Sequence, residues 1–344
     1  MEHVVVFAEK GRFAGWPANN GAWLWDGQEI LVGCTTGSFA ADQPFHRIRP
    51  PFTNLLCRSR DGGRTWRTER PAHFVGTAGE LTDPPRAWDF TAPGFAVRVV
   101  GDTYHGSAEK RGGFFVSGDR GAHWEGPYAF RGLEKERQLE GMIITARTDY
   151  VVEGRAQGLF MLSATRETLR DRVFCARTED GGQTFTFAGW MVPPSDPWRG
   201  VMPSTARCAD GSLVAAVRRR RMPDNVCWID AYASADGGAA WQPLGKVGET
   251  GAANGNPPAL ARLADGRLCC AYGRRDRRQM VARVSGDRGR TWGEETVIRD
   301  DFPREGVADF GYPRILQRGD GRIVVIYYWA TGERPEQHIA ATIW

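Results

Sequence analysis

Short runs of apolar residues recur along the whole chain, and turn-forming residues close each of them. Five of these runs are LLCR, GFFV, VFCA, DAYA and VARV, each followed by a segment rich in glycine and aspartate. Runs of about four to eight residues between such turns are typical of β-strands. The pattern therefore predicts an all-β protein.

One motif follows all five of these runs, with the pattern S/T-x-D-x-G-x-x-aromatic, here called the Asp box. Its aspartate can fold back onto backbone N–H groups, its glycine supplies a positive φ, and its aromatic ring can bury against a neighbouring strand. Each copy therefore predicts a strand–turn–strand corner. The copies are SRDGGRTW at Ser59–Trp66, SGDRGAHW at Ser117–Trp124, TEDGGQTF at Thr178–Phe185, SADGGAAW at Ser234–Trp241 and SGDRGRTW at Ser285–Trp292.

A second kind of turn lies between the Asp boxes. Asp-Gly pairs join β-like runs such as SLVAAVR, RLCCAYG and RIVVIYY, and Asp-Gly between such runs is a strong hairpin signal. An Asp-Gly hairpin followed by an Asp-box hairpin makes a four-stranded antiparallel sheet of roughly fifty to sixty residues, which suits a propeller blade and is too long for most solenoid repeats. The pairs are Asp26-Gly27, Asp210-Gly211, Asp265-Gly266 and Asp320-Gly321.

The end of the chain determines the number of blades. After Trp292 there are three apolar runs, YPRILQ, RIVVIYYW and HIAATIW, and no Asp box. The N-terminal run HVVVFAE can supply the fourth strand, and such closure removes exposed sheet edges. We expect a six-bladed β-propeller with five Asp boxes, forming a single domain over residues 1–344. Seven blades would require unusually short units.

The charged residues favour an anionic partner. Of 45 basic residues only Lys10, Lys110, Lys135 and Lys246 are lysines, so nearly all the positive charge is arginine. The planar guanidinium suits carboxylates, sulfates and phosphates. Nucleic acid is not an expected partner, because apart from Arg218–Arg221 no basic run is interleaved with aromatics. The chain has no P-loop, no G-x-G-x-x-G after a strand and no His/Cys ligand spacing, so we expect no cofactor and no metal.

Location follows from three further features of the sequence. Seven cysteines without a C-x-x-C pair predict buried, reduced thiols in a cytoplasmic protein. No apolar stretch approaches the length that spans a membrane. The N-terminus, MEHVVVFAEKG, lacks the apolar core of a secretory leader, so we expect a cytoplasmic protein or a secreted one that has been trimmed.

The five Asp boxes resemble those of the sialidase superfamily of BNR-repeat propellers, and the likeness covers nearly the whole chain. The resemblance implies that the Asp boxes lie on the face away from the active site. It also implies a tyrosine nucleophile activated by a glutamate, an aspartate acid/base and three arginines that hold a carboxylate. Tyr312, in the segment FGYPRIL, resembles the nucleophile. Arg218, which ends the run SLVAAVR, resembles the second arginine, and Arg277, eight residues before an Asp-box serine, resembles the third.

Other positions depart from the sialidase pattern. The glutamate expected sixteen residues before Arg218 falls on Met202, and Gly15-Trp16-Pro17 stands where an Arg-Ile-Pro carries the first arginine. Asp42 is the nearest candidate for the acid/base. Without the glutamate we expect Tyr312 to have no partner that lowers its pKa, and a neutral phenol is a poor nucleophile.

A looser resemblance links the second and third blades to propeller polysaccharide lyases of the ulvan lyase and rhamnose–glucuronate lyase type. It rests on the segments DTYHG and TARTDY and on a later arginine. In such enzymes β-elimination at a uronic acid needs a cation at the carboxylate, a base for the C5 proton and an acid for the leaving oxygen. The resemblance implies His105 and Tyr150 for proton transfer and Arg147 and Arg166 for the carboxylate, with His46 and His73 as rivals of His105.

We therefore predict a carbohydrate-active enzyme that cleaves an acidic oligosaccharide or polysaccharide, favouring metal-independent β-elimination at a uronic acid. A sialidase-type hydrolase and a non-catalytic glycan-binding propeller are the alternatives. Trp16 and Trp88 lie beside polar or turn residues and are candidate sugar platforms. The predicted catalytic residues are His105, Tyr150 and Tyr312, and the predicted substrate-binding residues are Arg147, Arg166, Arg218, Arg277, Trp16 and Trp88.

Overall fold

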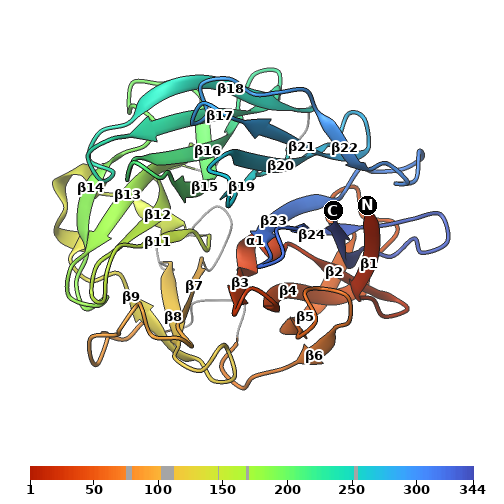
Figure 1. Ribbon diagram of the computed structural model, residues 1–344, viewed down its shortest axis with the longest axis horizontal. Coiled ribbons are helices and arrows are strands. Elements are labelled where there is room, and N and C mark those ends of the chain that lie inside the picture. Colours follow the sequence, from red (N-terminus) through yellow and green to blue (C-terminus); the bar gives the residue numbers. More distant parts are fainter. Residues whose placement is uncertain (75–79, 102–111, 146, 168–169, 252–254) are drawn as a thin grey trace.

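The computed structural model is a closed ring of six antiparallel sheets around a central axis (Figure 1). It describes residues 1–344 except 75–79, 102–111, 146, 168–169 and 252–254. The six sheets confirm the predicted six-bladed propeller. In each blade whose four strand positions are all filled, the first strand lies nearest the axis and the fourth at the rim (Figure 1).

The first three blades differ in their inner edge. In blades 1 and 3 two short strands share the innermost place, and in blade 2 that place holds no strand among the described residues. Blade 1 contains β2 (Arg12–Gly15), β3 (Ala22–Trp25), β4 (Glu29–Phe39), β5 (Ile48–Ser59) and β6 (Arg67–Glu69); blade 2 contains β7 (Ala96–Val100), β8 (Gly113–Ser117) and β9 (Glu125–Ala129); blade 3 contains β10 (Ile143–Thr145), β11 (Tyr150–Val152), β12 (Gly158–Thr165), β13 (Arg172–Thr178) and β14 (Thr186–Trp190).

Blades 4 to 6 are regular four-stranded sheets. Blade 4 contains β15 (Arg199–Arg207), β16 (Leu213–Arg220), β17 (Cys227–Ser234) and β18 (Gln242–Gly251); blade 5 contains β19 (Ala259–Arg262), β20 (Leu268–Arg274), β21 (Gln279–Ser285) and β22 (Thr296–Arg299); blade 6 contains β23 (Gly311–Gln317), β24 (Ile323–Trp329), β25 (His338–Ile343) and β1 (Glu2–Phe7). The helical segments are α1 (Pro17–Asn20) and two 3₁₀ turns, Leu133–Lys135 and Arg137–Leu139.

The N-terminal strand closes the ring as predicted. β1 pairs antiparallel with β25, with Glu2 opposite Ile343 and Val5 opposite Ala340, so the two ends of the chain lie side by side (Figure 1). This pairing gives blade 6 its outermost strand and satisfies an edge that would otherwise be open. All four predicted Asp-Gly pairs form tight hairpins between neighbouring strands; Asp210-Gly211, for example, lies between Arg207 and Leu213, which face each other.

The Asp boxes form the corner between the third and fourth strands of blades 1 to 5, also as predicted. In the first copy the hydroxyl of Ser59 donates to Asp61 at 2.8 Å and accepts from the backbone N–H of Gly63 at 2.8 Å. Asp61 accepts from the N–H of Thr65 at 2.9 Å, and the Trp66 indole donates to the Gly63 carbonyl at 2.8 Å. The motif therefore satisfies its own backbone donors and fixes the ring against the blade.

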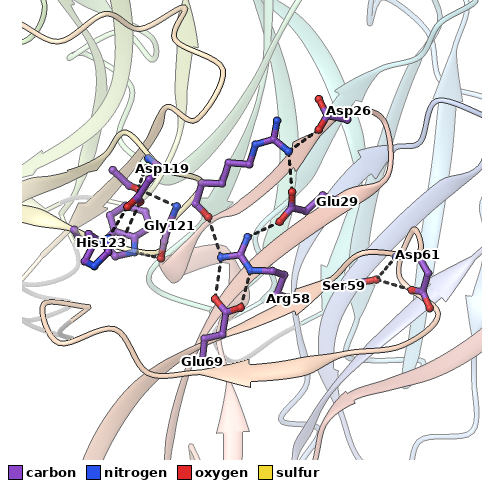
Figure 2. A network of polar contacts seen from close by, with 12 residues as sticks. Asp26, Glu29, Arg58, Ser59, Asp61, Glu69, Asp119, Gly121 and His123 are labelled. Atoms are coloured by element: carbon purple, nitrogen blue, oxygen red, sulfur yellow. Dashed lines mark hydrogen bonds and ion pairs between the residues drawn. The ribbon is translucent and has the colours of Figure 1, made fainter.

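Arginine side chains link several blades to the Asp box of the following blade. Figure 2 shows Arg58 of blade 1 bound to Glu29 at 2.8 Å and to Glu69 at 2.6 Å. The same guanidinium donates to the carbonyl of Arg120, in the Asp box of blade 2, at 3.0 Å. Arg120 in turn pairs with Glu29 at 2.8 Å. Two other arginines reach the next Asp box in the same way, from Arg177 to the Gly237 carbonyl and from Arg318 to the Gly62 carbonyl.

The core lies between neighbouring sheets and contains the cysteines. All seven cysteines are buried free thiols, which agrees with the sequence prediction. Within the described ranges, no helix is long and apolar enough to cross a membrane. Apolar packing between blades, the Asp-box corners and the arginine links together give a rigid ring whose innermost strands can carry a site.

Candidate functional site

Three inner positions share an unusual backbone conformation. Trp16, Met202 and Tyr312 have φ of 60°, 54° and 50°, and each is followed by a proline. Positive φ at a non-glycine residue costs of order 1–3 kcal/mol and gathers at functional sites. Met202 and Tyr312 are buried in one cluster, and Trp16 packs against that cluster. The structure thus brings together Met202 and Tyr312, where the resemblance to sialidases expects the glutamate and the nucleophile, and Trp16 of the segment that replaces the Arg-Ile-Pro.

Asn256 and Gly311 hold the Tyr312 backbone in this conformation. The N–H of Tyr312 donates to Oδ1 of Asn256 at 3.0 Å, and Nδ2 of Asn256 donates to the Phe310 carbonyl at 2.7 Å. Gly311 has φ of 105°, and a Cβ there would lie only 2.3 Å from Nδ2 of Asn256. Only glycine fits this position, so the residue before Tyr312 is fixed by the approach of the Asn256 amide.

Arg218 contacts the Tyr312 hydroxyl. It lies on β16 and is 2% exposed, and its Nη1 donates to Tyr312 Oη at 3.3 Å. The same Nη1 lies 3.6 Å from the thioether sulfur of Met202, and the guanidinium carbon is 5.8 Å from the centre of the tyrosine ring. A charged donor therefore faces the hydroxyl, and Met202 offers the same guanidinium only a weak acceptor.

Arg275 approaches from blade 5 and joins a buried carboxylate. Its Nη2 donates to the Phe310 carbonyl and to the Tyr328 hydroxyl, both at 3.1 Å, and lies 3.5 Å from Asp309. Asp309 also accepts from the Tyr328 hydroxyl. The Arg275 guanidinium carbon is 6.0 Å from the centre of the Tyr312 ring. This arginine is therefore a second cation beside the tyrosine.

His46 completes the cluster from the long hairpin between β4 and β5. Its Nδ1 lies 3.4 Å from Oδ1 of Asp309, and its ring centre lies 5.2 Å from that of Trp16. The side chain is 40% exposed. Burial acts to lower the pKa of His46, but the Asp309 carboxylate outweighs burial and raises it above the usual value.

The surroundings of Tyr312 favour its ionised form. Burial acts to raise the pKa of Tyr312, but the positive charges of Arg218, His46, Arg275 and Arg147 outweigh burial and lower it to about 8. At pH 7 about one phenol in ten is then ionised, against about one in a thousand at the ordinary value. The expectation that loss of the glutamate leaves this tyrosine without a partner that lowers its pKa is wrong.

Arg314 and Asp149 are two further charged residues near the middle of the ring. Arg314 is two residues beyond Tyr312 on β23, and its Nη2 donates to the carbonyls of Ala18 at 2.5 Å and Thr148. It thereby links blade 6 with blades 1 and 3 across the middle of the ring. Asp149 accepts a hydrogen bond from the N–H of Thr205 at 3.3 Å, and its buried Oδ2 has no hydrogen-bond partner among the residues that the structure describes. Burial raises the pKa of Asp149 to about 7.

Comparison with known proteins identifies the family of this propeller. A family model described as a BNR repeat-like domain matches residues 95–325. The chain belongs to the BNR repeat-like domain family. This match confirms the resemblance to the sialidase superfamily of BNR-repeat propellers, and the resemblance to polysaccharide lyases stays a prediction.

Solved structures share the fold of this BNR repeat-like propeller at low identity. A protein of unknown function from Dyadobacter fermentans is 19% identical with a TM-score of 0.74, covering 99% of this chain and 97% of that chain. An α-L-arabinanase from Penicillium chrysogenum, solved with arabinobiose, is 13% identical with a TM-score of 0.64, covering 100% and 98%. The Hadza microbial sialidase Hz136 is 12% identical with a TM-score of 0.60, covering 96% and 65%. A search of curated protein sequences finds no match.

Four of the predicted site residues lie in this cluster of the BNR repeat-like propeller or act on it. Tyr312 and Arg218 are in direct contact, Trp16 packs against the cluster, and Arg147 helps to lower the pKa of Tyr312. His105 lies outside the described residues. The cluster therefore unites residues that the sequence assigned to two different families of enzyme.

Tyr150 is part of the packed interior instead. Its hydroxyl accepts hydrogen bonds from the Trp23 indole at 3.2 Å and from the N–H of Val97 at 3.3 Å. Its ring stacks on Phe160 at 5.8 Å, and burial raises its pKa. These contacts join blades 1, 2 and 3, and they are those of a structural tyrosine.

The three other predicted residues have different neighbours. Trp88 is buried against Tyr128, with ring centres 5.1 Å apart, and its backbone N–H donates to the carbonyl of Gly181 in an Asp box. Arg166 is exposed and donates to the Glu140 carbonyl at 2.7 Å. Arg277 is 58% exposed and pairs with Glu295 at 3.3 Å. None of these contacts joins the cluster around Tyr312.

Sequence reasoning missed Arg275 and Asp309 and gave His46 only as a rival. Counting back from the Asp box selects Arg277. In the structure β20 ends at Arg274, and the turn that follows directs Arg275 toward the site. Asp309 lies three residues before Tyr312, a spacing that could have suggested it. His46 comes from a hairpin extension whose path the repeat pattern does not describe.

Proposed function

We propose that this protein is a glycoside hydrolase that acts on a sugar bearing an anionic group, with Tyr312 as the nucleophile. The observation that carries the proposal is the Tyr312 hydroxyl, 3.3 Å from Arg218 in a cluster of positive charges that lowers its pKa to about 8. A tyrosine that ionises near neutral pH at the inner edge of a propeller blade is suited to covalent catalysis.

Two guanidinium groups beside Tyr312 support an anionic substrate. The Arg218 and Arg275 guanidinium carbons lie 5.8 and 6.0 Å from the centre of the Tyr312 ring. Guanidinium groups can hold a carboxylate or sulfate on a sugar bidentately. A carboxylate nucleophile would repel such a sugar, whereas a phenol that is mostly neutral at pH 7 would not.

The shared fold lends further support. The arabinanase with a TM-score of 0.64 and the sialidase with a TM-score of 0.60 are both named as enzymes that act on carbohydrates. The half-buried ring of Trp16, which packs against the cluster, is a candidate platform for the sugar. Arg147 is a further candidate for holding the anionic group, since its charge already acts on Tyr312.

The test uses a panel of aryl glycosides of acidic sugars, including an aryl sialoside and aryl uronides, with release of the phenol as the signal. We expect Tyr312→Phe to lower kcat/KM at least about thousandfold, because the nucleophile is lost. The matched control is Tyr128→Phe, a buried tyrosine in the rim strand β9 that packs on Trp88, and it retains activity. Turnover that survives in Tyr312→Phe would refute the assignment.

β-Elimination at a uronic acid is the second candidate. It is favoured by Met202, whose thioether lies 3.6 Å from Nη1 of Arg218 at the position where the resemblance to sialidases expects a glutamate. In this case Tyr312 would act as a base or acid and no glycosyl–enzyme would form. The product would carry a C4–C5 double bond that absorbs in the near ultraviolet, so absorbance growth on uronate glycans distinguishes elimination from hydrolysis.

A further inference from the structure

His46 is delivered to the site by a segment that the repeat does not require. The strands β4 and β5, of 11 and 12 residues, are the longest in the described structure, and they extend the first blade into a hairpin that carries residues 40–47. At its base the N–H of Ala40 donates to the carbonyl of Arg47 at 3.0 Å. His46 itself has φ of 46°. The hairpin thus holds one histidine in a strained conformation beside the cluster.

Asp309 fixes the orientation of the His46 ring. Nδ1 lies 3.4 Å from Oδ1 of Asp309, whose side chain is 3% exposed. Nδ1 of His46 and Oδ2 of Asp309 are both buried, and neither forms a hydrogen bond of regular geometry among the described residues. The contact between Nδ1 and Oδ1 is therefore an ion pair, and contacts of this kind are often looser before substrate binds. Because Nδ1 is buried and the side chain is 40% exposed, the exposed part of the ring lies on its other atoms, which include Nε2.

This orientation determines which proton His46 can move. With Nδ1–H directed at a carboxylate, Nε2 keeps its lone pair and is available as a base. Asp309 is held in turn by the Tyr328 hydroxyl and by Arg275 at 3.5 Å. The charged groups that act on His46 are Asp309, Tyr312 and Arg275, and those that act on Tyr312 are Arg218, His46, Arg275 and Arg147.

We propose that His46, positioned by Asp309, is the base that removes the Tyr312 proton and the acid that then protonates the leaving oxygen. The inference rests on the proposed function. In the first step the Tyr312 O–H bond breaks, Nε2 takes the proton, and the phenolate attacks the anomeric carbon as the glycosidic bond breaks. The departing oxygen takes the proton from Nε2. In the second step Nε2 takes a proton from water, the hydroxide displaces Tyr312, and the phenolate recovers that proton.

Two other residues are less suited to this role. Met202, the residue in the place of the expected glutamate, carries a thioether that neither binds nor releases a proton in this pH range. Asp42, the acid/base candidate from the sequence, lies on the same hairpin but is 66% exposed and pairs with Arg49 at 2.5 Å. His46 is therefore the titratable group of this hairpin that contacts the cluster.

The experiment measures the reactivity of Tyr312 without needing the natural substrate. An aryl sulfonyl fluoride forms a bond from its sulfur to the phenol oxygen, expels fluoride and requires the phenol proton to be removed. Peptide mass spectrometry gives the rate constant at Tyr312 between about pH 5.5 and 9. We expect His46→Gln to lower that rate constant at pH 7 at least about tenfold, because a positioned base is lost. Asp309→Asn should lower it in the same direction, with folding checked by thermal unfolding.

His123→Gln is the matched control. His123 also pairs with an aspartate through Nδ1, at 2.6 Å from Asp119, but it is 90% exposed and belongs to an Asp box. Its substitution should leave the rate constant at Tyr312 unchanged. An unchanged rate constant in His46→Gln would overturn the proposal for His46.

The same variants separate this inference from the proposed function. Aryl glycoside hydrolysis that is equally fast in wild type and His46→Gln would overturn the role of His46 and leave Tyr312 as the nucleophile. Sulfonylation that depends on His46, in a protein that hydrolyses no acidic glycoside, would support the His46–Tyr312 proton transfer and refute glycoside hydrolysis.

Discussion

Asp149 offers a test of the electrostatics inside the ring. The residue is 7% exposed, one carboxyl oxygen accepts a hydrogen bond from a backbone N–H, and the other has no partner within the described part of the chain. Arg314, the cation whose charge acts on it, donates to the carbonyls of Ala18 and Thr148 instead. Asp149→Asn keeps the shape and the acceptor for Thr205 and removes the charge. We therefore expect the substitution to stabilise the protein at alkaline pH.

The magnitude follows from the pKa of Asp149, which burial raises from 3.8 to about 7. A difference of about three pH units corresponds to about 4 kcal/mol. Because the folded state binds this proton more tightly than the unfolded state, the wild type loses stability as pH rises from about 4 to about 7, and the loss is complete above that. The advantage of Asp149→Asn should therefore grow by about 3 kcal/mol between pH 4.5 and pH 8.

The assay is equilibrium urea unfolding of both proteins at the two pH values, followed by tryptophan fluorescence. All other titrating groups are shared, so they cancel in the difference between variant and wild type. The matched control is Asp83→Asn, whose exposed carboxylate lies 3.2 Å from Arg131, and its effect should be small at both pH values. A variant whose advantage stays constant or shrinks toward pH 8 would refute the reasoning about burial.

Two further predictions concern the arginines. Arg58→Met should lower the free energy of unfolding by about 2–3 kcal/mol, because it leaves Glu69 without its partner and breaks the link to blade 2. Arg86→Met, which removes an exposed ion pair, should have little effect in the same denaturation assay. Arg218→Met should raise the pKa of Tyr312 by about one pH unit or more, measured as tyrosinate absorbance against Tyr312→Phe. An unchanged titration would contradict the assigned cause.

The fold could be predicted because its signals are local. An Asp box such as Ser59–Trp66 closes its own hydrogen bonds within a few residues, and Asp-Gly pairs define hairpins in the same way. The closing strand was also predictable, because three runs after Trp292 leave a single place and HVVVFAE fits it. The Asp boxes and hairpins depend on contacts between residues that are close in the sequence, so local motifs predict them.

The site could be predicted only in part, because its members are joined through space. Tyr312 and Arg218 were found on segments that resemble a known family, although they are 94 residues apart. His46 reaches Asp309 across the junction of blades 1 and 6, and no local motif encodes that contact. Arg275 and Arg277 lie in the same turn, and the path of that turn directs Arg275 to the site and Arg277 to Glu295. Such choices require the three-dimensional arrangement of the blades.

The central claim is that Tyr312 forms a covalent bond to the sugar. The most direct measurement is the intact mass of the protein after rapid acid quenching during turnover of an aryl glycoside of an acidic sugar, followed by peptide mapping. We predict an added mass of one glycosyl unit on the peptide that carries Tyr312, absent in Tyr312→Phe. Steady turnover without any such adduct, together with a product that absorbs in the near ultraviolet, would contradict the account.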